Sequence, residues 1–297
     1  MRRDIEFETE DGVTLRGWFY PGAGGAGAAT VVMAHGFSAT KEMHLDDFAA
    51  HFAGDGLNVL VYDNRCLGDS DGSPRGEIDP WQQIRDYRDA ITYATTLEEV
   101  DPARIGIWGS SYSGAHVLVV AAIDRRVGCV VSQVPLIDGL ENARRLIRSD
   151  HWAGLRAALD GDRLARWQGE APAMMPVVSA EGGPCVLPTE DSAQFFTAIT
   201  EARETRWENA VTLRSVEYFI DYNPGAYVAR IAPTPLMLVV AKGDHLTPAD
   251  ISLAAYERAL EPKQLLLLPG GHFDAYVDAA FAESAPKQSA WFRRHLG

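Results

Sequence analysis

A strand-to-helix turn of small residues around Ser111 is the part of the sequence best suited to carry chemistry. The segment Arg104–Gly114 runs from an apolar strand, through this turn, into an apolar helix. A serine on such a sharp turn is exposed for attack on a carbonyl, provided that the residues two before and two after it are small. Gly109 and Ser113 meet this condition around Ser111, whereas Ser110 would be flanked by a tryptophan and a tyrosine. We therefore predict Ser111 as a nucleophile.

The partners that a serine nucleophile needs are supplied by an aspartate and a histidine much later in the chain. A serine hydroxyl requires a histidine base, which in turn requires a carboxylate to orient it and to stabilise its positive form. Asp244 follows the predicted strand Pro235–Ala241, and His272 follows the predicted strand Gln264–Leu268. Ligands of open α/β sheets gather at the carboxyl ends of the strands. We predict Asp244 and His272 as acid and base, with Asp250, which lies further from the strand end, as the alternative acid.

The segment His35-Gly36-Phe37 follows another predicted strand, Thr30–Ala34. The negative oxygen that forms during attack on a carbonyl is stabilised by backbone N–H groups, one of which belongs to the residue after the nucleophile. We expect the backbone N–H groups of Tyr112 and Phe37 to form this oxyanion hole. His35 is expected to order its loop by hydrogen bonding rather than to transfer protons.

The elements that must position these residues predict an α/β fold. Two β-prone runs, Ile5–Thr9 and Val13–Tyr20, flank Asp11-Gly12, which is a strong hairpin signal. After a Gly- and Ala-rich loop, Pro21–Ala29, short apolar runs alternate with longer amphipathic segments, as in a doubly wound, mostly parallel sheet. The predicted strands are Thr30–Ala34, Leu57–Tyr62, Arg104–Trp108, Val127–Gln133, Pro235–Ala241 and Gln264–Leu268, and the predicted helices are Met43–Ala53, Trp81–Ala94, Tyr112–Ala122, Ala249–Leu260 and Ala275–His295.

The predicted helix Trp81–Ala94 has a regular apolar pattern. Trp81, Ile84, Tyr87 and Ile91 recur at intervals of three or four residues. This spacing places all four on one side of a helix, so we expect them to form one buried face.

The strand signal disappears between residues 135 and 231, where several helices with Pro and Gly breaks are expected. We predict an α/β core formed by residues 1–134 and 232–297, with residues 135–231 inserted as a helical cap. The insertion is rich in aromatic residues, most of which should pack inside it while a few face a pocket. These aromatic residues are Trp152, Trp167, Phe195, Phe196, Trp207, Tyr218, Phe219 and Tyr222.

Composition excludes several classes of function. The net charge of −14 leaves no excess of Lys and Arg for a nucleic-acid backbone. Cys66, Cys129 and Cys185 provide neither a disulfide framework nor a metal clip, which favours a reducing compartment. The start of the chain does not resemble a signal peptide, and no apolar run approaches the roughly 20 residues that span a bilayer. We expect a cytoplasmic protein without a membrane partner, and a homodimer is left open.

Cofactor motifs give no positive signal. The sequence contains no phosphate-binding or dinucleotide-binding glycine motif and no clustered metal ligands. We therefore expect no cofactor and no metal. Cys66 lacks the small-residue turn that surrounds Ser111, so it is not expected to be a nucleophile. Arg65 beside it is expected to pair with neighbouring carboxylates.

With these features together, the chain resembles an α/β hydrolase along its whole length. The resemblance implies the α/β-hydrolase fold, in which nucleophile, acid and base follow in the order found here. The features that carry it are the His35-Gly36 turn, the loop Asp63–Gly72, the turn at Ser111, and the loops with Asp244 and His272.

A narrower resemblance concerns two segments. Ile78–Gln83 and Trp108–Gly114 are similar to a branch that includes polyketide-tailoring acyltransferases and dienelactone-hydrolase-like enzymes. This similarity implies acyl transfer in biosynthesis, with an alcohol or amine replacing water. The turn departs from the family pattern by one residue, because Ser113 stands where a glycine is usual.

These observations predict a serine hydrolase that cleaves an ester, lactone or thioester of a small molecule through an acyl-Ser111 intermediate. Acyl transfer in secondary metabolism uses the same intermediate, and the sequence does not separate it from hydrolysis. A peptidase-like hydrolase is another alternative, because Ser111-Tyr112 is similar to the turn of some dipeptidyl-peptidase and esterase relatives. A non-enzymatic small-molecule receptor is the alternative from a different class.

Overall fold

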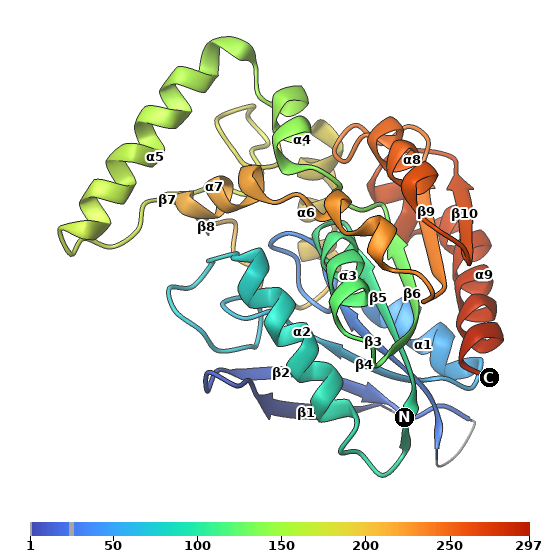
Figure 1. Cartoon of the computed structure of the whole chain (residues 1–297). Helices are drawn as coiled ribbons and strands as arrows, with labels where there is room; N and C mark the ends of the chain where they lie inside the picture. The colour runs from blue at the N-terminus through green and yellow to red at the C-terminus, as the bar shows by residue number, and fades with distance from the viewer. Residues whose placement is uncertain (1, 24–26) are drawn as a thin grey trace.

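One eight-stranded sheet, in the order β1-β2-β4-β3-β5-β6-β9-β10, forms the centre of the computed structural model, which describes residues 2–23 and 27–297 (Figure 1). β1 and β2 pair antiparallel, as do β2 and β4, whereas all other neighbours are parallel. This arrangement confirms the predicted hairpin and the mostly parallel sheet. The strands are β1 (Arg3–Glu8), β2 (Thr14–Tyr20), β3 (Ala28–Ala34), β4 (Asn58–Tyr62), β5 (Val100–Ser110), β6 (Val127–Gln133), β9 (Leu236–Ala241) and β10 (Lys263–Leu268).

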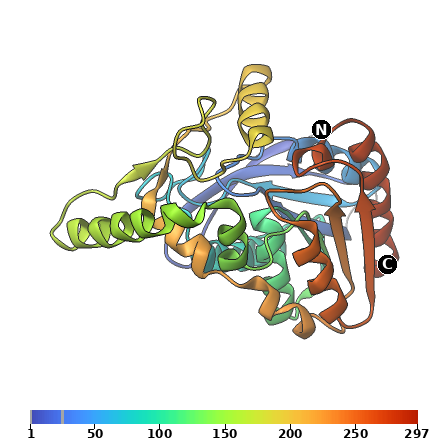
Figure 2. The ribbon, with the colours of Figure 1, turned by 90° about the horizontal axis from the view of Figure 1, so that it is seen from above.

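Helices cover both faces of the sheet (Figures 1 and 2). One apolar core unites the sheet with α2, α3 and α8, and a second unites it with α1 and α9. Every residue of β3, β4 and β9 is buried, as expected for central strands covered on both sides. The helices are α1 (Leu45–Gly54), α2 (Pro80–Ala94), α3 (Tyr112–Ile123), α4 (Gly139–Leu146), α5 (Trp152–Trp167), α6 (Glu190–Ala202), α7 (Leu213–Asp221), α8 (Ala249–Arg258) and α9 (Asp278–Leu296), with short 3-10 turns η1 (Ser149–His151), η2 (Pro224–Ala226), η3 (Val228–Arg230) and η4 (Phe273–Tyr276).

The segment between β6 and β9 contains α4 to α7, and α5 projects away from the sheet (Figure 2). It also contains a small antiparallel pair that the sequence did not predict, formed by β7 (Met174–Met175) and β8 (Val211–Thr212). Strands of two residues are too short to show the alternation by which strands are recognised. The division into a core and a cap at residues 135–231 remains a prediction.

Several predicted boundaries differ from the structure. β5 begins at Val100, earlier than predicted, because Val100 pairs with Ala28 across a register shift. The predicted helix Ala275–His295 is interrupted, since the extended Val277 separates η4, which ends at Tyr276, from α9, which begins at Asp278. The predicted loop Pro21–Ala29 is shorter, with Ala28 and Ala29 in β3, and its residues 24–26 lie outside the described residues.

The expected buried face of α2 is wrong for one residue. Ile84, Tyr87 and Ile91 are buried, but Trp81 is 45% exposed. Trp81 lies in the first turn of the helix, where its indole forms T-shaped ring contacts with Tyr222 and Tyr227. Helical spacing gives the direction of a side chain but not how far the neighbouring layer extends.

Among the described helices, none is both long and apolar enough to cross a bilayer.

Candidate active site

Ser111 lies between β5 and α3 in a strained backbone conformation. Its φ of 57° and ψ of −115° are rarely adopted by residues other than glycine. A Cβ at Gly109 would lie 2.1 Å from the backbone oxygen of Ser113, so the strand and the helix pass too closely for a larger residue. The small-residue turn predicted from the sequence therefore places Ser111 on a sharp bend.

The loop after β3 reaches this bend. A Cβ at Gly36 would lie 2.8 Å from the Ser111 Cβ, so only glycine fits beside the predicted nucleophile. Phe37 follows, and its ring meets the ring of Tyr112 edge-on at 5.3 Å. Tyr112 is the first residue of α3, and the first N–H groups of a helix have no partner within it. These positions suit the expected oxyanion hole, which remains a prediction.

The structure brings Asp244 and His272 together. Asp244 Oδ2 lies 2.7 Å from His272 Nδ1, and both side chains are buried. The other oxygen of Asp244 accepts the backbone N–H groups of Leu246 and Thr247 at 2.9 and 2.7 Å. With Nδ1 bound to the carboxylate, Nε2 is the nitrogen left for a proton from a nucleophile. The alternative acid, Asp250, pairs instead with an arginine, Arg145, at 2.6 Å on the exposed face of α8.

Thr247 is a polar contact of this pair that the sequence analysis missed. Its hydroxyl lies 2.8 Å from Asp244 Oδ2, 3.1 Å from His272 Nδ1 and 3.0 Å from the backbone oxygen of Val134. The sequence signal was an aspartate followed three residues later by a threonine, which is typical of a turn in which the carboxylate accepts local N–H bonds.

His35 has the structural role expected of it. Its Nε2 accepts the backbone N–H of Asn64 at 3.0 Å, so Nδ1 carries the proton and donates to the Gly36 oxygen at 2.9 Å. Burial lowers the pKa of His35, which keeps the ring neutral. His35 therefore ties the loop after β3 to the loop after β4.

Lys41, in the loop after β3, is another residue that the sequence analysis missed. Its buried ammonium lies 2.7 Å from Asp63, 2.6 Å from Asp69 and 2.8 Å from Glu42. Burial alone would lower the pKa of Lys41, but the carboxylates outweigh it and raise that pKa. Within the described residues these three acids are grouped closely enough to hold a metal ion. The ammonium already supplies the positive charge there, so this cluster does not fit a cation.

Arg65 pairs with carboxylates, as expected. It contacts Asp86 through both Nε, at 2.7 Å, and Nη2, and it contacts Asp11 at 2.8 and 2.9 Å. Burial raises the pKa of the neighbouring Cys66 thiol to about 11, so this cysteine is not a thiolate nucleophile at neutral pH.

The hydroxyl of Ser110, the residue before the predicted nucleophile, forms a structural hydrogen bond. It is fully buried, and its hydroxyl donates to the Tyr276 hydroxyl at 2.6 Å. A chain of buried side-chain hydrogen bonds continues from there through Gln133 and Gln288 to the Trp108 indole. These hydrogen bonds hold in place the end of β5, which leads into the turn.

The helix α3 carries a third buried histidine, His116. Its Nε2 donates to Gln83 Oε1 at 2.9 Å, and its Nδ1 accepts from the Tyr222 hydroxyl at 3.1 Å. Burial lowers the pKa of His116 to about 3, so the ring is neutral at pH 7. No carboxylate contacts it among the described residues, which distinguishes it from His272.

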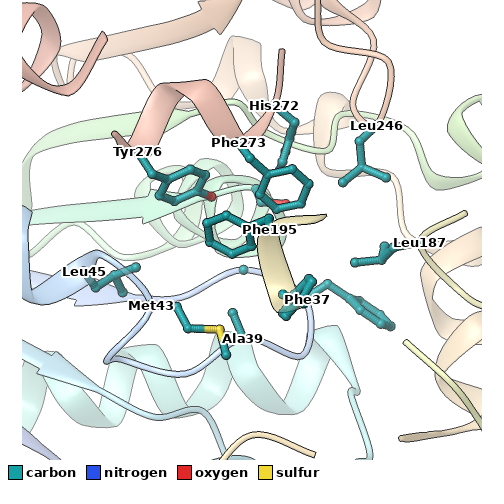
Figure 3. A pocket seen from close by; sticks show the side chains of 13 residues that line it. Phe37, Ala39, Met43, Leu45, Leu187, Phe195, Leu246, His272, Phe273 and Tyr276 are labelled. Atoms are coloured by element: carbon teal, nitrogen blue, oxygen red, sulfur yellow. The ribbon is translucent and has the colours of Figure 1, made fainter. Parts of the chain in front are cut away.

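Ser111 and His272 line one narrow cavity of about 30 Å³ (Figure 3). Its wall is otherwise almost entirely apolar. Phe195 and Phe196, two of the aromatic residues of the predicted insertion, face it as expected for a few of them. The remaining lining residues are Gly36, Phe37, Ala39, Met43, Leu45, Leu187, Leu246, Phe273 and Tyr276.

Comparison with known proteins identifies the family. The alpha/beta hydrolase family matches residues 31–285, so the chain belongs to the α/β hydrolases. It is 33% identical to polyketide transferase af380 of Aspergillus fumigatus, with 99% of each chain covered. It is 31% identical to a thiohydrolase of Eupenicillium brefeldianum, covering 100% of this chain and 95% of that one. The crystal structure of the α/β hydrolase GrgF from a Penicillium species superposes with a TM-score of 0.87 at 32% identity, over 100% of this chain and 99% of that one.

Proposed function

We propose that the protein is a serine hydrolase that cleaves an ester, lactone or thioester of a small molecule through an acyl-Ser111 intermediate. One observation carries this proposal: the 2.7 Å contact between Asp244 and His272 lies at a cavity that the strained Ser111 also lines. A carboxylate, an imidazole and a serine on a sharp turn are the parts that acyl transfer to serine needs. A thiohydrolase among the relatives supports a thioester as one substrate type.

The first half of the reaction forms the acyl-enzyme. The Ser111 oxygen attacks the carbonyl carbon while its proton passes to His272 Nε2, and Asp244 stabilises the imidazolium. The carbonyl oxygen becomes negative and accepts the N–H groups of Phe37 and Tyr112. The bond to the alcohol or thiol then breaks, and that leaving group takes the proton from His272.

The second half releases the acid. His272 removes a proton from water, the resulting hydroxide attacks the acyl carbon, and the bond to the Ser111 oxygen breaks as His272 returns the proton to it. Water supplies the proton that returns to Ser111 and the hydroxyl group of the released acid.

Acyl transfer to an alcohol or amine is the second candidate. It uses the same acyl-Ser111 intermediate, with the acceptor in place of water. Two observations favour it: the cavity lining is almost entirely apolar, which disfavours water, and relatives include a polyketide transferase. We propose that the substrate is a small acyl compound and that the protein binds neither a nucleic acid nor a membrane. A cytoplasmic location and a homodimer are also proposals.

Turnover of a nitrophenyl ester and of a simple thioester tests the nucleophile. We expect Ser111→Ala to lower kcat by about 10⁶-fold, because loss of a serine nucleophile removes the covalent route. Ser284→Ala is the matched control, since this buried serine of α9 has a hydroxyl without a partner among the described residues and lies outside the cavity.

Adding an alcohol or amine to the same reaction separates the two functions. A transferase should form the new ester or amide at the expense of the free acid, whereas a hydrolase should form the acid alone. Equal turnover by wild type and Ser111→Ala would contradict both. Absence of turnover with every ester and thioester would favour the receptor alternative.

A further inference from the structure

The cavity at Ser111 is too small for a long acyl group as it stands. Its volume of about 30 Å³ accommodates a few water molecules at most. Pockets for small-molecule ligands usually enclose roughly 300–1,000 Å³. An acyl chain of more than a few carbons therefore has room only if a side chain of the lining is removed or displaced.

Phe195 is the side chain that fills this space from the side of α6. Its ring stacks on Phe273 at 4.4 Å and lies 5.8 Å from the ring of Tyr276 (Figure 3). Phe273 directly follows His272, so the Phe195 ring lies over the residue next to the predicted base. The ring also contacts the rings of His44 and Phe196, and a phenyl ring forms no directional hydrogen bond with its neighbours.

The neighbouring Phe196 has a different role. It is almost completely buried, and its ring stacks on Trp207 at 4.8 Å. The Trp207 indole in turn donates to the Ser38 hydroxyl at 3.0 Å. Phe196 is thus part of the packing that fixes α6 to the loop after β3, whereas Phe195 is only half-buried and meets that packing through one edge-to-face contact with Phe196 at 5.4 Å.

The chemistry of the lining defines the acyl group. Apart from His272, the cavity has no ionisable group that would pair with a charged acyl chain, and the Tyr276 hydroxyl is engaged with Ser110 at 2.6 Å. A charged or strongly polar chain would lose its hydration without gaining partners. The lining therefore suits an uncharged, apolar acyl group.

From this geometry we propose that Phe195 is a specificity-determining residue: its ring occupies the position of the distal part of an apolar acyl chain and limits the length that the cavity accepts. This inference rests on the proposed acyl-Ser111 mechanism. Removal of the ring opens the space over Phe273, and each methylene that enters it is withdrawn from water.

The test is the chain-length profile of kcat/KM for nitrophenyl esters from acetyl to decanoyl. We expect the wild type to prefer short esters and Phe195→Ala to move the optimum to longer ones. Three additional buried methylenes, at about fourfold each, should raise the ratio of long-chain to acetyl kcat/KM by about 60-fold. Phe195→Leu should shift the profile in the same direction by less, and it provides a second variant if the alanine variant folds poorly.

Phe281→Ala is the matched control. Phe281 is also a half-buried phenylalanine held by ring contacts, with Phe48 at 4.8 Å and with His51, but it lies on α9 outside the cavity. We expect its profile to keep the shape of the wild type. A Phe195→Ala profile parallel to that of the wild type would overturn the inference alone. Wild-type protein that turns over none of the esters would overturn the proposed function and this inference with it.

Discussion

The two walls of the cavity are built by different means. The wall with Ser111, Gly36 and His272 consists of loops at the ends of strands, and hydrogen bonds and ion pairs fix it, such as those of Asp244 and Lys41. The wall from α6 presents the rings of Phe195 and Phe196, which contact other rings.

This difference separates the two tasks of the site. Directional bonds hold reacting groups to a fraction of an ångström, as proton transfer and attack on a carbonyl demand. Stacked rings exclude water but allow substitution by other apolar side chains at modest cost. We therefore expect changes in the polar wall to reduce the rate or the stability, and changes in the α6 wall to alter which substrates are accepted.

After that of Ser111→Ala, the largest effect should come from Asp244→Asn. The amide presents a donor as well as an acceptor to His272 Nδ1, so the imidazole is held in the wrong tautomer and its positive form is not stabilised. We expect kcat for a nitrophenyl ester to fall by about 10⁴-fold.

The control for this variant is Asp250→Asn, because Asp250 was the alternative acid and pairs with Arg145 at the surface. Its activity should remain within about twofold of the wild type, since exposed ion pairs contribute little. A larger loss in Asp250→Asn than in Asp244→Asn would reverse the assignment of the acid.

The next effect concerns the stability of the polar wall. Lys41→Met leaves Asp63 buried without its positive partner, and breaking a buried ion pair from one side costs about 3–5 kcal/mol. Urea unfolding should show this loss in the free energy of unfolding. Lys287→Met, which removes an exposed pair with Glu283, should cost at most about 0.5 kcal/mol. Similar losses in the two variants would show that Lys41 does not hold the loop in the way described.

A smaller effect concerns the buried His116. The folded-state pKa of His116, about 3, is below its ordinary value of 6.5, so the unfolded chain binds a proton between these values and the folded one does not. Stability from this residue is therefore complete above pH 6.5 and is lost as pH falls. Between pH 7.5 and pH 5.0 the loss should be about 2 kcal/mol.

The difference between wild type and His116→Gln isolates this contribution, because glutamine can keep both hydrogen bonds of the ring without titrating. Urea unfolding of both proteins at several pH values should show that the wild type loses about 2 kcal/mol more than the variant on acidification. Parallel pH profiles would mean that His116 does not bury a neutral ring.

The parts of the fold that were predictable are those with a local signal. The hairpin around Asp11-Gly12 and the apolar central strands were predicted because each is readable within a few residues. The early start of β5 at Val100 depends on pairing with Ala28 across the sheet, which no local pattern contains. The same holds for the two-residue strands β7 and β8, whose partners lie far apart in the sequence.

The candidate site divides in the same way. Ser111, Asp244 and His272 follow recognisable strand ends, so residue type and spacing alone are enough to point to them. Lys41 has no distinguishing neighbours in the sequence, and its role depends on carboxylates that reach it from the loop after β4. Phe195 was one of several aromatic residues, and only the position of α6 relative to η4 directs it to the cavity.

Covalent labelling tests the assignment of Ser111 as the nucleophile, on which the proposed mechanism depends. Intact mass should be measured for wild type, Ser111→Ala and Ser284→Ala after treatment with a fluorophosphonate. We predict addition of one probe to the wild type and to Ser284→Ala, and none to Ser111→Ala. Equal labelling of Ser111→Ala would contradict this assignment and place the nucleophile elsewhere in the chain.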